Sequence, residues 1–203
     1  MHENHNSFLP ITHEGKVYFG GNQNWYLEKC RRSNGCGPVA AANITCYLAR
    51  KDSERYGALY PYPSLEKKYF LAHMNNMYTY FRPSIFGEIS LNGWTKKMEN
   101  YAKERGVNFK RVAYEKPFTL EKNLIYLKEG LESDCPVATL NLDVIDRKNE
   151  FGWHWMIITE YYEDIEGNSW IGVSSWGKKY IINYQKHFKA MNRLLGGGLI
   201  YFK

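Results

Sequence analysis

Cys36 is the residue in this chain whose type and surroundings most favour chemistry. It lies between two glycines, and Pro38 and the alanines from Ala40 to Ala42 favour a helix that begins beside it and continues to about Lys51. Free backbone N–H groups at the start of that helix would stabilise a thiolate, and the glycines would leave room for a substrate backbone. A lone cysteine can equally be a small buried apolar residue, so the rest of the chain has to decide between these interpretations.

A nucleophilic thiol needs a base, and the sequence supplies six histidines. His154 is the strongest candidate because it begins an apolar run to Thr159, which predicts a strand with His154 and Met156 on one face and the neighbouring tryptophans on the other. The other five lie in the N-terminal segment, on an expected helix or at the expected surface: His2, His5, His13, His73 and His187. We therefore pair His154 with Cys36 rather than interpret it as a core residue.

The composition is that of a globular protein, since 44% of the residues are hydrophobic and 16% are aromatic. The formal net charge is +6, but the basic residues are scattered and no RNA-binding signature is present, which argues against a nucleic-acid partner. No apolar run reaches the length of a membrane span, and the first residues lack the apolar core of a signal peptide. The expectation is a cytoplasmic protein that does not enter a membrane.

The four cysteines do not follow a disulfide or metal-binding pattern. Cys30, Cys36, Cys46 and Cys135 include no C-x-x-C pair and have no histidine at zinc spacing. The sequence therefore predicts no disulfide framework, no metal site and no cofactor.

The elements that must position these residues change in character along the chain. Residues 1–22 are expected to form an extended or loop-like leader, residues 23–132 are mainly helical, and residues 133–203 are rich in short β-type runs. Apart from the Cys36 helix, helices are expected at 65–80, 90–106 and 119–131, a charged loop at 28–34 and a short strand at 107–114. Later strands are expected at 137–145, 153–162, 170–175, 180–184 and 198–202. This segregation predicts an α+β fold and a single domain over residues 1–203.

Three motifs, in this order, resemble the papain-like cysteine peptidases. They are Gln23 ahead of the run from Gly35 to Ala42, the strand from His154 to Thr159, and Ser174-Ser175-Trp176-Gly177 shortly after it. The nearest match is the bacterial branch that includes the double-glycine leader peptidases, and the similarity spans roughly residues 20–203. The resemblance implies a papain-like fold, in which a helical N-terminal part carries the nucleophile helix and packs on a C-terminal antiparallel sheet.

The resemblance also implies roles for individual residues. Cys36 matches the nucleophile and His154 matches the base that shares its proton. Gln23 matches the glutamine whose side-chain amide donates to the oxyanion, together with the Cys36 backbone N–H. Gln23 lies further before the cysteine than the corresponding residue of papain, so Asn24 or Asn34 is an alternative donor.

The third catalytic position departs from the family pattern. Ser174 stands where the family has an asparagine or aspartate, just before a shielding tryptophan, here Trp176. A serine hydroxyl can accept a hydrogen bond from the imidazole, but it carries no charge that would favour an imidazolium. A regular strand would point Ser175 to the opposite face, and the alternative acceptors are Asn141 and Asp143.

These roles imply a cysteine hydrolase that cleaves a peptide or isopeptide bond of a peptide or protein substrate through a thioester acyl-enzyme. A second hypothesis is a cysteine acyltransferase, which needs an amine acceptor that outcompetes water. A third is a binding module that kept the scaffold and lost turnover. The uncharged Ser174 favours this third hypothesis, and the intact Cys36 and His154 oppose it.

Overall fold

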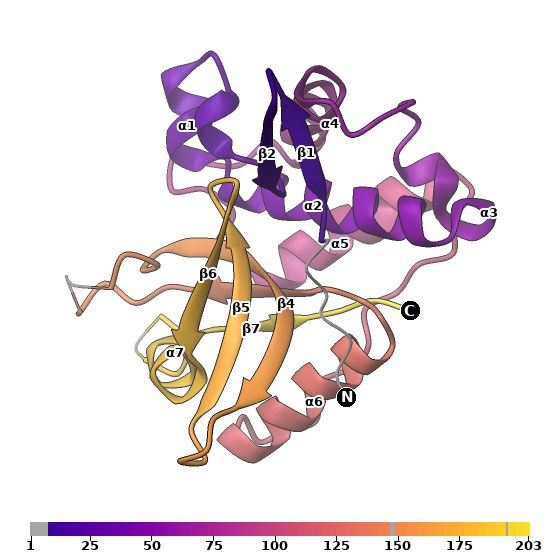
Figure 1. Cartoon of the computed structure of the whole chain (residues 1–203). Coiled ribbons are helices and arrows are strands. Elements are labelled where there is room, and N and C mark those ends of the chain that lie inside the picture. The colour runs from indigo at the N-terminus through magenta and orange to yellow at the C-terminus, as the bar shows by residue number, and fades with distance from the viewer. Residues whose placement is uncertain (1–7, 147–148, 194) are drawn as a thin grey trace.

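The computed structural model describes residues 8–146, 149–193 and 195–203. Residues 1–7 of the expected leader, with His2 and His5, lie outside the described residues. The described chain combines helices with a five-stranded antiparallel sheet in an α+β arrangement (Figure 1). Most of the helices precede this sheet in the chain, as the sequence predicts.

The helices expected in the first two thirds of the chain are confirmed, with small differences at their ends. Ser90 caps α5 and Thr119 caps α6, because each side-chain hydroxyl accepts a backbone N–H of the first helical turn. The helical elements before the sheet are η1 (Gln23–Trp25), α1 (Lys29–Asn34), α2 (Cys36–Lys51), α3 (Ser53–Tyr56), η2 (Gly57–Leu59), α4 (Lys67–Phe81), α5 (Leu91–Lys103) and α6 (Leu120–Glu132).

Three segments differ from the expectation. The leader contains a hairpin of β1 (Pro10–His13) and β2 (Lys16–Phe19), and Phe8 and Ile11 bury their side chains in the core. The expected charged loop at 28–34 forms α1 instead. The described residues 107–114 are not a strand, because their backbone pairs only briefly with the C-terminal residues, including an isolated bridge from Arg111 to Phe202.

The five predicted strands of the sheet are confirmed. They are β3 (Val137–Asn141), β4 (His154–Glu163), β5 (Ser169–Ser175), β6 (Lys178–Asn183) and β7 (Gly197–Ile200), in the spatial order β6-β5-β4-β3-β7 with every neighbouring pair antiparallel. An additional helix, α7 (Tyr184–Met191), follows β6. It buries His187 with Nε2 at 2.8 Å from Thr139 Oγ1, so the expectation of a surface histidine is wrong.

Helices cover both faces of the sheet. α2 and α5 lie against the face that carries Trp155, whose ring stacks on Trp94 of α5 with centroids 4.9 Å apart. α7 covers the face that carries Thr139, and α6 lies beside α7, where Asn123 and Tyr184 share a hydrogen bond. α6 therefore packs with the sheet, although the sequence groups it with the helical part (Figure 1).

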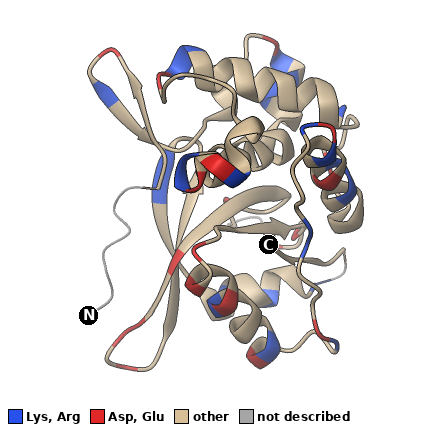
Figure 2. Ribbon diagram, turned by 90° about the vertical axis from the view of Figure 1, so that its right-hand side faces the viewer, with Lys and Arg blue, Asp and Glu red and all other residues tan. Residues whose placement is uncertain are grey.

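Charged side chains are distributed over the helices with both signs side by side (Figure 2). Within the described ranges, no helix combines the length and the apolar character that crossing a bilayer requires. The same residues contain no group of three or more His, Cys, Asp or Glu side chains that could hold a metal ion. All four cysteines are free thiols.

Candidate functional site

Cys36 is the first residue of α2, as its neighbours in the sequence predict. The helix behind it is almost entirely buried and packs on β4, which fixes where its N-terminus lies. The backbone N–H groups of Trp155, Gly37 and Cys36 point to the sulfur and lower its pKa, but burial has the larger effect and raises the pKa of the thiol. The helix start therefore favours the thiolate in the expected direction, but burial outweighs this effect and Cys36 rests as a thiol.

The glycines beside Cys36 serve internal packing rather than substrate access. A Cβ atom added at Gly35 would lie 2.4 Å from the Arg31 carbonyl oxygen. A Cβ atom added at Gly37 would lie 3.1 Å from Glu88 Cβ. Only glycine permits the close approach at Gly35, and a side chain at Gly37 would be tight against Glu88, so neighbouring protein occupies the space next to both glycines.

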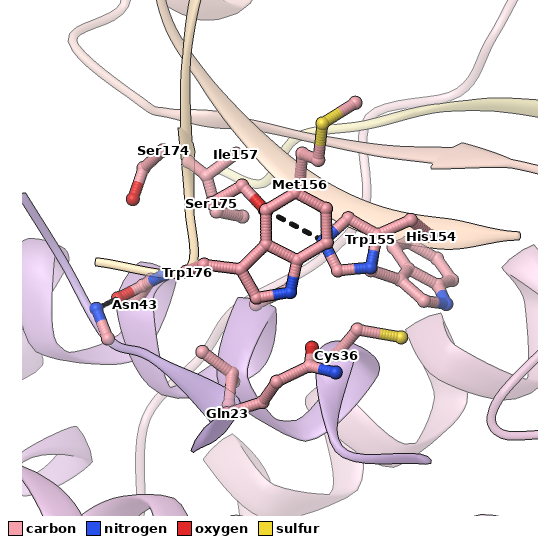
Figure 3. Close-up of a pocket in the computed structure, with 13 residues that line it drawn as sticks. Gln23, Cys36, Asn43, His154, Trp155, Met156, Ile157, Ser174, Ser175 and Trp176 are labelled. Atoms are coloured by element: carbon pink, nitrogen blue, oxygen red, sulfur yellow. Dashed lines mark hydrogen bonds between the residues drawn. The ribbon is translucent and has the colours of Figure 1, made fainter. Parts of the chain in front are cut away.

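His154 is the first residue of β4 and is buried. Its Nε2 lies 2.8 Å from Ser175 Oγ, and its ring stacks on the Trp176 indole with centroids 4.4 Å apart (Figure 3). The bond at Nε2 leaves Nδ1 available to another partner. Burial lowers the pKa of His154 to about 3, so the imidazole is neutral at neutral pH and can accept a proton as a general base.

One pocket brings the four predicted residues together (Figure 3). Gln23, Cys36, His154 and Ser174 line it, and they come from η1, α2, β4 and β5. In this view the imidazole ring of His154 lies between the Ser175 hydroxyl and the Cys36 side chain (Figure 3). Because these residues are far apart in the chain, their convergence is a property of the fold.

The serine that bonds to His154 is Ser175 and not Ser174, which corrects the prediction. Ser174 Oγ donates to the Phe19 carbonyl oxygen at 2.7 Å and so ties β5 to the end of β2. Ser174 also lies opposite Ile157 in the sheet, so its side chain is on the face away from His154.

A β-bulge is the reason for this difference. The register next to the β4–β5 turn, continued along the hairpin, would place Ser174 opposite Ile158 and on the face of His154. Between Ile158 and Glu160 the register shifts by one residue, so Ser175 takes that face instead. The sequence does not reveal the bulge, because both faces of β4 are buried there and the apolar pattern is continuous.

Ser175 and Ser174 provide a matched pair of variants. Ser175→Ala removes the hydroxyl that orients His154, and the loss of a bond of about 1 kcal/mol should slow alkylation of Cys36 about fivefold at neutral pH. Ser175→Thr keeps the hydroxyl and should retain most of the rate. Ser174→Ala breaks the bond to Phe19, so it should lower the free energy of unfolding by about 1 kcal/mol and leave the rate unchanged. Equal rates for the two alanine variants would contradict the role of Ser175.

Gln23 is held at the pocket by α1. Its Nε2 donates to the Arg32 carbonyl oxygen at 2.7 Å, which leaves a second amide N–H free to donate. The Arg32 guanidinium binds two carbonyl oxygens of the preceding turn, so α1 fixes the loop that follows Gln23. Asn24 is exposed and Asn34 donates to Cys30 Sγ, so Gln23 is the best placed of the three candidate donors.

The alternative acceptors for His154 are bonded elsewhere. Asn141 lies opposite His154 across β3 and β4, but its Oδ1 accepts from the Asp143 backbone N–H at 2.9 Å. The Asp143 carboxylate accepts from Arg193 at 2.7 Å and from the Ile145 backbone N–H at 3.0 Å. Both side chains therefore order the loop that follows β3.

The pocket contains two further groups that the sequence does not predict. The Trp155 backbone N–H reaches the Cys36 sulfur, and no side-chain pattern could mark a main-chain donor. Asn43 Oδ1 accepts from the Gly21 backbone N–H at 2.9 Å, so α2 also orders the chain just before Gln23. The sequence signal for Asn43 is its position, because a polar residue seven positions, or about two turns, after Cys36 lies on the same face of the helix.

Comparison of the chain with known protein families, with curated proteins and with solved structures found no match in any of the three. The chemistry of the site therefore has to follow from the pocket itself. It combines a thiol at a helix start, a neutral imidazole held by a hydroxyl and an indole, and a side-chain amide with a free N–H.

Proposed function

We propose that the protein is a papain-like cysteine hydrolase that cleaves a peptide or isopeptide bond of a peptide or protein substrate. The observation that carries this proposal is the convergence of Cys36 and His154 in one pocket, with the imidazole held by Ser175 and Trp176. A helix that begins at the thiol and packs on an antiparallel sheet that carries the base also agrees with the family resemblance.

The proposed reaction has two halves. In the first, His154 takes the proton of the Cys36 thiol as the sulfur attacks the carbonyl carbon. The C–N bond then breaks, and the imidazolium gives its proton to the leaving amine. In the second half, His154 takes a proton from water as the oxygen attacks the thioester carbonyl. The C–S bond then breaks to release the carboxylic acid, and the imidazolium returns its proton to the sulfur and restores the thiol. The Gln23 amide and the Cys36 N–H would donate to the oxyanion in both halves.

Both partners are uncharged at the start of this reaction. Burial raises the pKa of Cys36 and lowers that of His154, so the resting pair is a thiol and an imidazole. Ser175 suits this state, because a hydroxyl has no charge with which to stabilise a standing imidazolium. Proton transfer therefore accompanies the attack of the sulfur.

The test is the rate at which iodoacetamide alkylates Cys36 as a function of pH. Cys36 is half-buried and Cys30 is exposed, so the measurement uses a Cys30→Ser background and resolves each cysteine by mass spectrometry. At about pH 6.5, Cys36 should react at least about tenfold faster in the parent protein than in His154→Ala, because only the thiolate fraction reacts without the base.

The Cys36→Ala protein supplies the blank for the two buried thiols, Cys46 and Cys135. If the alkylation rate of Cys36 at about pH 6.5 is the same with and without His154, the catalytic proposal fails. A binding module on the same scaffold would then be the better account, since the uncharged Ser175 at the third position is its main support.

A further inference from the structure

The segment between α4 and α5 exposes large apolar side chains. Ile85 is 79% exposed, Phe86 is 62% exposed and Ile89 is 44% exposed. Single exposed apolar residues are common on protein surfaces, but three in one short segment form a patch, here called the apolar wall.

The two tryptophans that flank His154 hold the apolar wall in place. Trp153 Nε1 donates to the Phe86 carbonyl oxygen at 2.9 Å, and Trp155 Nε1 donates to the Glu88 carbonyl oxygen at 2.5 Å. Both bonds go to main-chain carbonyl oxygens, so they fix the position of the segment relative to His154. The apolar side chains of the wall take no part in these bonds.

The same segment lies against the start of the nucleophile helix. The Glu88 side chain fills the space beside Gly37, the residue that follows Cys36. Trp94 of α5 donates from Nε1 to the Gly37 carbonyl oxygen at 3.0 Å and so fastens the far end of the segment to the same helix turn. The segment that carries the apolar wall therefore contacts the first turn of the nucleophile helix and both tryptophans beside His154.

The wall presents no free charge to an incoming group. Glu88 is the one charged residue between positions 83 and 89, and its buried carboxylate pairs with Lys97 and accepts from the Ser90 backbone N–H. An apolar side chain that meets this surface gains by leaving water, whereas a charged or polar one finds no partner to replace its hydration.

We infer that the apolar wall, formed by Ile85, Phe86 and Ile89, receives an apolar side chain of the peptide substrate next to the bond that is cleaved. This inference rests on the proposed function, because it assigns the specificity with which Cys36 is acylated. The occupant is the substrate itself, since the segment that carries the wall contacts the residue after the thiol through Glu88 and the two tryptophans beside the base through its main chain.

The experiment compares acylation of Cys36 by the p-nitrophenyl esters of N-acetyl-leucine and N-acetyl-serine, each normalised to its reaction with free cysteine. We expect the leucine ester to be preferred about tenfold, and the double variant Ile85→Ser with Phe86→Ser to lose this preference. Both substitutions change exposed side chains and leave the main-chain bonds to the tryptophans intact. The matched control is Ile165→Ser in the β4–β5 turn, where Ile165 is 105% exposed, and it should keep the preference.

The iodoacetamide rate of Cys36 separates two kinds of failure. If the parent protein accepts both esters equally, or if the double variant keeps the preference, the inference is overturned and the proposed function stands. If iodoacetamide reacts but neither ester acylates Cys36, the proposed function fails and the inference fails with it. A lost preference in a double variant whose iodoacetamide rate is unchanged supports the apolar wall, because the thiol and its base are then intact.

Discussion

Lowering the pH from about 7 to about 5 is expected to remove about 6 kcal/mol from the free energy of unfolding. Three buried histidines carry this effect. Burial lowers the pKa of His73 and His154 to about 3 and that of His187 to about 4, against an ordinary value of 6.5. All three imidazoles therefore stay neutral in the folded protein at a pH where the unfolded chain protonates them.

The sign of the effect follows from proton binding. Below an ordinary histidine pKa of 6.5, the unfolded chain takes up protons that the folded chain excludes, so stability falls as the pH falls. Three such groups together cost up to about 4 kcal/mol per pH unit, and the loss ends near each folded pKa. Because a whole domain is stabilised by only about 5–15 kcal/mol, the protein should unfold at about pH 5 or not far below it.

The bonding of these histidines explains why nothing offsets their burial. Each imidazole Nε2 lies 2.8 Å from a side-chain hydroxyl: His73 with Thr45, His154 with Ser175, and His187 with Thr139. A hydroxyl oxygen can accept a hydrogen bond from the imidazole, but it carries no negative charge that would stabilise a buried imidazolium. A carboxylate in the same place would have raised the histidine pKa instead.

Urea unfolding followed by circular dichroism at about pH 7, 6 and 5 measures this loss. His73→Gln lowers stability near pH 7 because it removes the bond to Thr45, but it should also reduce the slope by about 1.4 kcal/mol per pH unit. Carboxylates act in a lower pH window: the Trp170 N–H lowers the pKa of Asp164 from 3.8 to about 2, so its contribution to stability is lost only as the pH falls from about 3.8 to about 2. A free energy of unfolding that stays constant between about pH 7 and pH 5 would contradict the prediction.

The parts of the site that the sequence predicts are those with local signals. The helix at Cys36 follows from Pro38 and the alanines after it. The strand at His154 follows from a short apolar run, which is typical of a buried strand. Local propensity alone does not indicate that Cys36 and His154 lie in one pocket. That prediction comes from the order of the three motifs along the chain.

The parts that could not be predicted depend on contacts between distant segments. A one-residue bulge in β4 decides that Ser175, and not Ser174, faces His154, and the buried faces of the strand hide it. His187 is buried because α7 packs on Thr139, a contact with a strand far away in the chain. The pKa of Cys36 depends on burial, which outweighs the helix-start effect that the sequence does show.

The second large effect is expected at Gln23. Replacing it in Gln23→Ala should slow acylation of Cys36 by the N-acetyl-leucine ester about 10²–10³-fold, because the carbonyl oxygen gains negative charge in the transition state and loses a donor. Its Nε2 is already aimed by the bond to the Arg32 carbonyl oxygen, so the free N–H would need no reorganisation when the charge develops.

Alkylation by iodoacetamide separates this role from a structural one. That reaction displaces iodide from a saturated carbon and forms no oxyanion, so Gln23→Ala should leave its rate nearly unchanged. The matched control is Asn24→Ala, which removes an exposed amide next to Gln23 and should affect neither reaction. An equal loss of both rates in Gln23→Ala would mean that the variant displaces Cys36 through α1. Unchanged rates in both reactions would mean that Gln23 does not donate to the oxyanion. That role would then fall to the backbone N–H groups that point to the sulfur, those of Cys36, Gly37 and Trp155.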